Sequence, residues 1–255
     1  FFLSRQEKLD IAKAVLDAVG GRIQVVASGH TADDKATQFK EIESMMKLDG
    51  LGAYVLVSNR LDPQRQGEEV FAANAREIFD RFPQVDFGIY ECPHPWKHLV
   101  STEFLKQASR QGRLVFLKDT CCDYELVRRR LQAVEGTSLK IFNANAASWF
   151  DSVAHGGAGY NGIMANFHPD LYKWAYDHRQ TQPEKAKKVS DWLTLAAMIE
   201  MRIYPVSAKF YQSLAGVPMG LTTRSANTAL LDKNAMQEVY SLIEMEKELR
   251  KALGI

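Results

Sequence analysis

A regular alternation of strands and helices runs through most of this 255-residue sequence. Short apolar runs, each long enough for one strand, are separated by longer segments with the 3.6-residue periodicity of amphipathic helices. The expected strands cover residues 22–27, 54–57, 86–90, 114–118, 139–142 and 159–165. Strands that alternate with helices pair in parallel, because each helix returns the chain to the start of the next strand. The sequence therefore predicts an α/β fold with a parallel sheet covered by helices.

Capping residues indicate where several of the helices begin. Ser4 followed by Glu7 has the pattern of a capping box, Thr31 is expected to cap the second helix, and Ser101 a later one. The expected helices cover about 5–19, 32–48, 68–82, 102–111, 124–134 and 146–154. Residues 58–63 are expected to form a polar loop.

Beyond Asn166 the pattern changes to helices alone. They are expected at about 169–179, 183–203, 206–214 and 234–252. This region has no glycine-rich loop, and we expect no buried polar cluster in it. It is interpreted as a helical bundle that serves packing or oligomerisation. We predict two regions, residues 1–168 and 169–255.

Composition limits the possible partners and compartment. Lys and Arg number 32 against 31 Asp and Glu, a net charge of +1, so no global field attracts nucleic acid or an anionic membrane. Three cysteines, two of them adjacent, are a poor pattern for a disulfide framework and favour a reduced, cytoplasmic protein. No apolar run is long enough to span a bilayer.

The strongest candidate for chemistry is Lys118. The apolar run 114–117 predicts a buried strand that delivers this lysine at its C-terminal end, where parallel barrels place their active sites. A lysine held among apolar groups has a lowered pKa, and its neutral amine can attack a carbonyl. The alternative is a lysine that leaves the strand into solvent.

Tyr90 is expected at the same end of the adjacent strand, where its phenol can pass protons. Alone, it is better interpreted as an aromatic residue of the core or rim. The pairing with Lys118 favours a catalytic role.

Several motifs together resemble the dihydrodipicolinate synthase and N-acetylneuraminate lyase family. They are Tyr90-Glu-Cys-Pro93, Phe116-Leu-Lys118-Asp119, Gly156-Gly-Ala-Gly159 leading to Asn166-Phe-His-Pro169, the opening Leu3-Ser4 with Glu7, and Tyr204-Pro205 with Lys209. The resemblance implies a TIM (β/α)8 barrel with a C-terminal helical bundle, commonly tetrameric, that forms a Schiff base between lysine and a 2-oxo acid without a cofactor. The six strands would be the third to the eighth, so we expect a barrel that here lacks about its first two strands.

The resemblance also implies roles for individual residues. Lys118 would form the Schiff base, Tyr90 would transfer protons, and the backbone carbonyl of Asn161 would face the oxo acid. Gly162 would let the strand approach a ligand, or simply relieve crowding. Asn143, with Asn145, would bind a hydroxylated substrate or cap the next helix; the two interpretations are equally supported.

Departures from the family pattern concern the second substrate. Pro95 stands where members that make dihydrodipicolinate carry an arginine, and Ser58-Asn59-Arg60 stands where they carry paired tyrosines. Both argue against dihydrodipicolinate synthesis. A bulkier acceptor near Trp96, or a sugar acid held by Arg60 and His94, fits better.

Three functional hypotheses remain from the sequence. The first is a Schiff-base lyase, aldolase or hydro-lyase, expected to be a homo-oligomer (dimer or tetramer), that acts on pyruvate or a 2-oxo-3-deoxy acid. The second is a non-catalytic relative that binds an oxo acid or sugar acid. The third is a metal-dependent barrel enzyme with ligands among Glu91, His94, His98, Asp119, Cys121 and Asp123. It is the weakest, because these residues lack a recognised zinc spacing.

Overall fold

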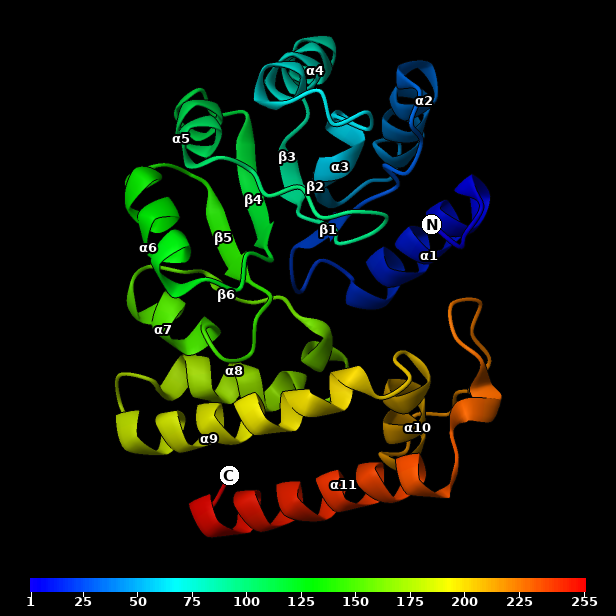
Figure 1. The fold of residues 1–255 in the computed structure, drawn as a ribbon, viewed down its shortest axis with the longest axis vertical. Coiled ribbons are helices and arrows are strands. Elements are labelled where there is room, and N and C mark those ends of the chain that lie inside the picture. The colour runs from blue at the N-terminus through cyan, green and yellow to red at the C-terminus, as the bar shows by residue number, and fades with distance from the viewer. The chain divides into compact units, whose positions relative to one another are not determined.

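The computed structural model describes residues 1–255, and its chain forms two compact units (Figure 1). The first comprises residues 1, 3–143 and 154–158, and the second comprises residues 2, 144–153 and 159–255. The two regions expected from the sequence, divided after residue 168, stay a prediction about domains.

Strands β1–β5 of a six-stranded parallel sheet lie in the first unit, and the short strand β6 lies in the second. The strands are β1 (Val25–Ala27), β2 (Leu51–Val57), β3 (Phe87–Tyr90), β4 (Leu114–Asp119), β5 (Lys140–Asn143) and β6 (Gly159–Tyr160). Their order in the sheet is their order in the sequence, and each of β1 to β4 pairs in parallel with the strand that follows it. The predicted α/β class and parallel sheet are therefore confirmed.

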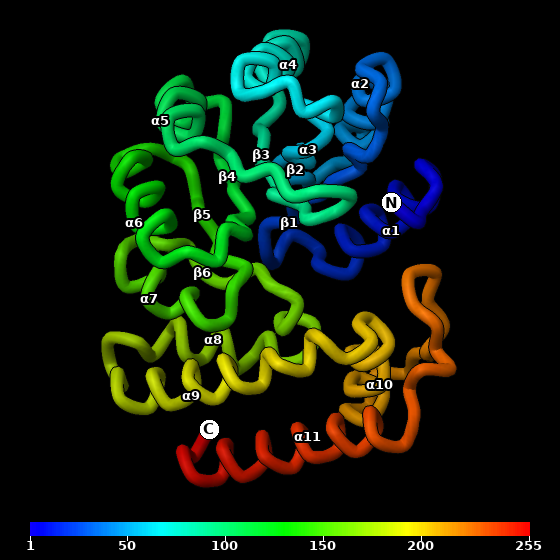
Figure 2. Tube along the Cα trace, viewed as in Figure 1, coloured from blue at the N-terminus to red at the C-terminus, as the bar shows by residue number.

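Helices cover one face of this sheet. They are α1 (Arg5–Val19), α2 (Lys35–Met45), α3 (Ser58–Leu61), α4 (Glu68–Arg81), α5 (Thr102–Arg110) and α6 (Tyr124–Ala133). Figure 1 shows α2, α4, α5 and α6 in an arc outside β1–β5, and the tube in Figure 2 follows the chain from each strand to the next helix. The sheet thus curls as part of a barrel.

The core of the first unit lies between the sheet and these helices. Leu56, Ile89 and Leu117 point from three neighbouring strands toward the helices and are fully buried. Ile78 of α4 and Leu105 of α5 pack in the same cluster. Each such side chain contributes about 1.5–3 kcal/mol when buried, so this face fixes the register of the strands. Residues of the opposite parity, Lys118 among them, must face the other side.

The helix caps were predicted in part. The capping box of Ser4 and Glu7 is present, and Ser101 accepts a hydrogen bond from the Phe104 N–H at 3.1 Å. The prediction for Thr31 was wrong, because Asp34 caps α2. The Thr31 hydroxyl instead donates to the buried carboxylate of Glu41 at 3.0 Å, which removes it from the helix end.

Other differences concern element boundaries. Residues 58–61 form the short helix α3 instead of a loop, and the predicted helix 146–154 begins only at Trp149. The last predicted strand ends at Tyr160, and Ile163–Asn166 is a 3-10 turn, η1. Met164, which the sequence assigned to the strand, is fully buried in the core of the second unit from this turn.

The second unit is helical apart from β6. Its elements are α7 (Trp149–Ala154), η1, α8 (Pro169–His178), α9 (Pro183–Ala196), η2 (Ala197–Met201), α10 (Val206–Leu214), η3 (Thr228–Leu230) and α11 (Lys233–Leu253). The predicted helix 183–203 is shorter, because its last turns are the 3-10 segment η2. None of the helices combines the length and apolar character needed to cross a membrane.

The expectation that this region holds no buried polar cluster was wrong. His168 is fully buried, its Nδ1 lies 3.0 Å from Glu246 Oε2, and the Tyr211 hydroxyl donates to the same carboxylate at 2.5 Å. Arg250 donates to Glu246 from the edge of the cluster at 2.6 Å. The three buried groups come from the start of α8, from α10 and from α11, which is why no local pattern revealed them.

Candidate active site

Lys118 and Tyr90 occupy paired positions at the carboxyl ends of two adjacent strands. The register of β3 and β4 sets Tyr90 opposite Lys118, and the Lys118 Nζ lies 4.4 Å from the centre of the Tyr90 ring. Both side chains are partly buried. The structure therefore brings together the amine and the phenol that the sequence singled out.

The face of the sheet that carries Lys118 is aromatic below it. Phe116, two residues earlier on β4, packs its ring 5.3 Å from that of Phe142 on β5. Gly88 on β3 makes room for this packing, because a Cβ there would lie 2.7 Å from Phe116 Cδ1. Lys118 thus emerges from an apolar surface with an aromatic neighbour on each side of its strand.

An ionic cluster lies on the opposite, helix-facing side of the same strand ends. Arg130 of α6 donates from Nη2 to Glu91 Oε1 at 2.7 Å and from Nη1 to Asp119, and all three side chains are fully buried. Burial raises the pKa of Glu91, an effect that Arg130 opposes and Asp119 reinforces. Burial alone would lower the pKa of Arg130, but the two carboxylates hold it above its ordinary value.

The loop after Tyr90 is held by the start of α3. The Asn59 Nδ2 lies 3.0, 2.8 and 2.7 Å from the carbonyl oxygens of Cys92, His94 and Trp96, which share its two N–H donors. Ser58 Oγ donates to the His98 carbonyl at 2.8 Å. Lys97 Nζ donates to the Thr120 carbonyl at 2.8 Å, which ties this loop to the loop after β4.

The predicted substrate residues of this loop region have different surroundings. The His94 side chain is exposed, and its backbone carbonyl is one of the acceptors for Asn59. The Arg60 guanidinium pairs with Asp33 and lies 5.1 Å over the Phe1 ring. A substrate carboxylate at Arg60 would compete with Asp33, so its binding role stays a prediction.

The two asparagines after β5 separate into different environments. Asn143 is opposite Asp119 in the sheet and is buried, so strand alternation places it on the helix-facing side, away from Lys118. The Asn145 side-chain oxygen accepts from the N–H groups of Ala147 and Ser148, both at 3.0 Å. This geometry favours the capping interpretation for Asn145.

Asn161 and Gly162 lie in the second unit, directly after β6. Both are partly buried. A Cβ at Gly162 would lie 2.1 Å from the Tyr160 hydroxyl and 2.4 Å from the Ala144 carbonyl. Local packing alone therefore requires glycine here, and the ligand roles of these two residues stay predictions.

Sequence reasoning missed two residues that organise the site, Asn59 and Arg130. The sequence does contain a pattern that could have identified Arg130. Its helical spacing places it on the same face as the buried residues Val127, Leu131 and Val134, and a charge on a buried face needs a partner of opposite charge. Glu91 and Asp119, which were weighed as metal ligands, are those partners. No group of three or more His, Cys, Asp or Glu side chains is arranged to hold a metal ion.

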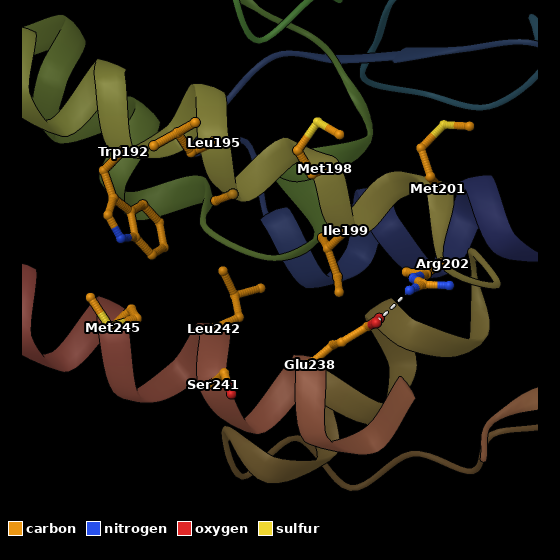
Figure 3. A pocket seen from close by; sticks show the side chains of 11 residues that line it. Trp192, Leu195, Met198, Ile199, Met201, Arg202, Glu238, Ser241, Leu242 and Met245 are labelled. Carbon is orange, nitrogen blue, oxygen red and sulfur yellow. Dashed lines mark hydrogen bonds and ion pairs between the residues drawn. The ribbon is translucent and has the colours of Figure 1, made fainter. Parts of the chain in front are cut away.

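A separate apolar groove lies wholly within the second unit, between α9 with η2 and α11 (Figure 3). Its volume is about 620 Å³. Figure 3 shows Trp192, Ile199 and Leu242 pointing between the helices, while Met198 and Met201 point away from α11. Its polar feature is the ion pair of Arg202 with Glu238, at 2.5 Å. Without a nucleophile or converging polar groups, this groove is not a candidate for catalysis.

No model of a known protein family matches the sequence. Solved structures do match. The chain superposes on YagE, a prophage protein of the dihydrodipicolinic acid synthase family from E. coli K12 in complex with pyruvate, with a TM-score of 0.84 and 16% identity, over 96% of this chain and 83% of that one. It superposes on dihydrodipicolinate synthase from Cyanidioschyzon merolae with lysine bound, with a TM-score of 0.82 and 18% identity, over 95% and 80% of the two chains.

A third match is a putative dihydrodipicolinate synthase family protein from Coccidioides immitis, with a TM-score of 0.80 and 16% identity, over 98% of this chain and 81% of that one. The class defined by these matches is the α/β fold shared with TIM-barrel-like lyases. More particularly, the chain has the fold of proteins of the dihydrodipicolinate synthase family, as the sequence motifs predicted.

Proposed function

We propose that this chain is a member of the dihydrodipicolinate synthase and N-acetylneuraminate lyase family and acts as a Schiff-base lyase or aldolase on pyruvate or a 2-oxo-3-deoxy acid. The observation that carries the proposal is the pairing of Lys118 with Tyr90 at the carboxyl ends of β4 and β3, with Nζ 4.4 Å from the ring centre. The fold shared with YagE, which was solved with pyruvate, supports the substrate class.

Lys118 is the nucleophile in this proposal. Its neutral amine attacks the C2 carbonyl of the oxo acid to form a carbinolamine, which loses water to give an iminium ion. The rings of Phe116 and Phe142 lie below Lys118 on the same face of the sheet and form an apolar floor to the proposed site.

Tyr90 transfers the protons that these steps require. Its phenol donates a proton to the departing hydroxyl of the carbinolamine and is left as a phenolate. The phenolate then takes up a proton from the substrate in the next step. The iminium then accepts the electron pair of a bond at C3 and becomes an enamine. The bond is either a C–H bond, whose proton passes to the Tyr90 phenolate left by the dehydration step, or a C–C bond in the cleavage direction. In that direction Tyr90 removes the proton of the substrate hydroxyl as the aldehyde leaves.

The second substrate is proposed to differ from that of a dihydrodipicolinate synthase. Asn59 and Ser58 are buried and engaged with the loop after β3, and Pro95 has no group that binds a carboxylate. The exposed side chain of His94 is proposed to contact the acceptor end of a sugar acid, together with Arg60. Contacts from Asn161 and Gly162 to the substrate belong to the same proposal, whereas Asn143 faces the helices, away from Lys118.

The test is reduction of the protein with borohydride in the presence of pyruvate, and then of a panel of 2-oxo acids, followed by peptide mass spectrometry. We expect a reduced adduct on Lys118 that disappears in Lys118→Met. The matched control is Lys140→Met. Lys140 lies on the same face of the sheet but at the amino end of β5, and its loss should leave the adduct intact.

Absence of an adduct with every oxo acid, in a folded protein, would contradict the lyase proposal. Binding of an oxo acid or sugar acid without an adduct, measured by calorimetry, would instead support the non-catalytic relative. An adduct on Lys97 in place of Lys118 would show that the nucleophile was misassigned.

Assembly and compartment belong to the same proposal. The chain is proposed to form a homodimer or homotetramer, and the exposed apolar wall of the α9–α11 groove supports self-association. One protein with this fold is described as a monomeric dihydrodipicolinate synthase variant, so the fold itself does not dictate an oligomer. All three cysteines are free thiols, which supports a cytoplasmic location.

A further inference from the structure

We infer that Arg130 is a positioning residue that holds the two strand ends bearing Lys118 and Tyr90 at their working distance. The inference rests on the proposed Schiff-base function and adds a residue outside the catalytic pair. Glu91 directly follows Tyr90 in the chain, and Asp119 directly follows Lys118. One guanidinium binds both carboxylates, so it joins β3 and β4 one residue beyond the reacting groups.

The cluster can hold the two strand ends firmly because each carboxylate oxygen of Glu91 and Asp119 accepts a hydrogen bond. Glu91 Oε1 accepts from the Val100 N–H and from Arg130 Nη2, and Glu91 Oε2 accepts from the Thr120 N–H, at 2.8, 2.7 and 2.8 Å. Asp119 Oδ1 accepts from the Cys121 N–H at 2.9 Å. The loops after both strands are therefore fixed by the same cluster.

Arg130 also contacts the backbone beyond the loop after β3. Its Nη2 donates to the Val100 carbonyl at 2.6 Å, just before α5 begins. A planar guanidinium can satisfy two carboxylates and a carbonyl at once, whereas an ammonium group acts as a point charge with no fixed fork. The position therefore needs arginine for its shape as well as for its charge.

The cluster lies behind the site and not in it. Glu91, Asp119 and Arg130 are all 0% exposed, and Asp119 has the strand parity opposite to Lys118. No substrate reaches them, so their influence on the reaction passes through the positions of Lys118 and Tyr90. A displacement of about 1 Å in a reacting group can cost about 100-fold in rate.

The test compares Arg130→Lys with the wild-type protein and with Ile78→Val. Ile78→Val reduces buried packing in the last turn of α4, which leads into the amino end of β3, and controls for general loss of stability. We expect Arg130→Lys to lower the maximum rate of pyruvate trapping on Lys118 by about 10- to 100-fold, with less than a threefold change in the half-saturating pyruvate concentration. Ile78→Val should trap pyruvate at the wild-type rate.

A second readout does not depend on oxo-acid chemistry. Reductive methylation with formaldehyde and cyanoborohydride, read by peptide mass spectrometry, gives the reactivity of Lys118 relative to Lys106 on α5. We expect at least a threefold change in this ratio in Arg130→Lys and no change in Ile78→Val. If wild-type protein traps no oxo acid, the proposed function fails, and this ratio still decides the role of Arg130.

An unchanged labelling ratio in folded Arg130→Lys would overturn the inference. Equal slowing of trapping in Arg130→Lys and Ile78→Val would also overturn it, because the effect would then follow stability alone. If Arg130→Lys does not fold, Asp119→Asn replaces it, since the amide keeps an acceptor for the Cys121 N–H and weakens only the contact to Arg130. The same outcomes apply to that variant.

Discussion

At the scale of single residues, the site is a lysine beside a tyrosine. The parallel register fixes their Cα positions, and strand alternation fixes the face on which both lie. Tyr90 has two separable parts: its ring lies beside the Lys118 Nζ, and its phenolic hydroxyl is the group proposed to transfer protons. Removing the hydroxyl without the ring separates these two roles.

Tyr90→Phe is therefore expected to lower the rate of pyruvate trapping by about 100-fold, since it removes a positioned proton donor. The binding constant for pyruvate, measured by calorimetry, should change little because the ring remains. Tyr124→Phe, an exposed position on α6, is the control. Trapping at the wild-type rate in Tyr90→Phe would show that another group or water transfers the proton.

His30 is a second residue whose environment makes a measurable prediction. It is fully buried, its Nδ1 accepts from the Val57 N–H at 3.0 Å, and burial lowers its pKa to about 4. Between about pH 6.5, the ordinary histidine pKa, and pH 4 the unfolded state binds the proton and the folded state does not. The free energy of unfolding must therefore fall as the pH falls through this window.

The expected loss is up to about 3 kcal/mol, at about 1.4 kcal/mol for each pKa unit. His30→Asn can keep an acceptor for Val57 but does not titrate, so its unfolding free energy should fall less over the same range. Urea unfolding at pH 7 and at pH 4.5 measures both proteins. Parallel losses in the two proteins would show that His30 does not carry this pH dependence.

At the scale of elements, features that depend on neighbouring residues were predicted well, and features that depend on residues distant in the sequence were not. The capping box at Ser4 and the apolar run that ends at Lys118 are local sequence patterns, so the first helix and β4 could be predicted. α3 was expected to be a loop because Ser58 and Asn59 are polar. Both residues are nevertheless buried, because they donate hydrogen bonds to carbonyls of a loop that is distant in the sequence. A single sequence does not show such partners.

The same reason explains what the sequence could not say about the site. Lys118 was identified because it ends an apolar strand, and Tyr90 because it pairs with Lys118 on the adjacent strand and belongs to a motif that resembles the family. Arg130 was missed because its role depends on two carboxylates, at the ends of two different strands, that both pair with this residue of α6. Met164 was assigned to a strand because it is apolar, whereas it reaches the core from a 3-10 turn.

Asn59 gives a prediction at this scale, because one amide holds the loop between β3 and α5. Asn59→Ala leaves three carbonyls without their side-chain donor and should cost about 2 kcal/mol or more of unfolding free energy. Asn74→Ala, which removes a donor from the Leu61 carbonyl alone, should cost about 1 kcal/mol. Urea unfolding measures both.

Hydrogen exchange provides the local readout for this loop. Amides of residues 92–98 should exchange faster in Asn59→Ala, while those of α4 should not change. Unchanged exchange in 92–98 would mean that Ser58 and Lys97 hold the loop without Asn59.

At the scale of the whole molecule, the question is what the exposed apolar side chains contact. Leu195, Met198 and Met201 are 74%, 71% and 82% exposed and follow one another along α9 and η2, among the residues that border the α9–α11 groove. Isolated apolar residues on a surface are common, but a contiguous row beside an apolar groove is typical of an interface. A row and a groove on the same face can pair with their own copy around a twofold axis, each row entering the other groove.

Self-association through this face makes a quantitative prediction. Met198→Glu would place an unpaired carboxylate in an apolar contact and should weaken association by at least about 100-fold. Light scattering after size exclusion should give the mass of a dimer or tetramer for the wild-type protein and a smaller mass for Met198→Glu. Ile23→Glu is the matched control, because Ile23 is 69% exposed and belongs to the first unit, whereas the groove belongs to the second. A wild-type monomer at micromolar concentration would contradict self-association. An oligomer that Met198→Glu leaves intact would place the contact on another face, and the groove would then need a different occupant.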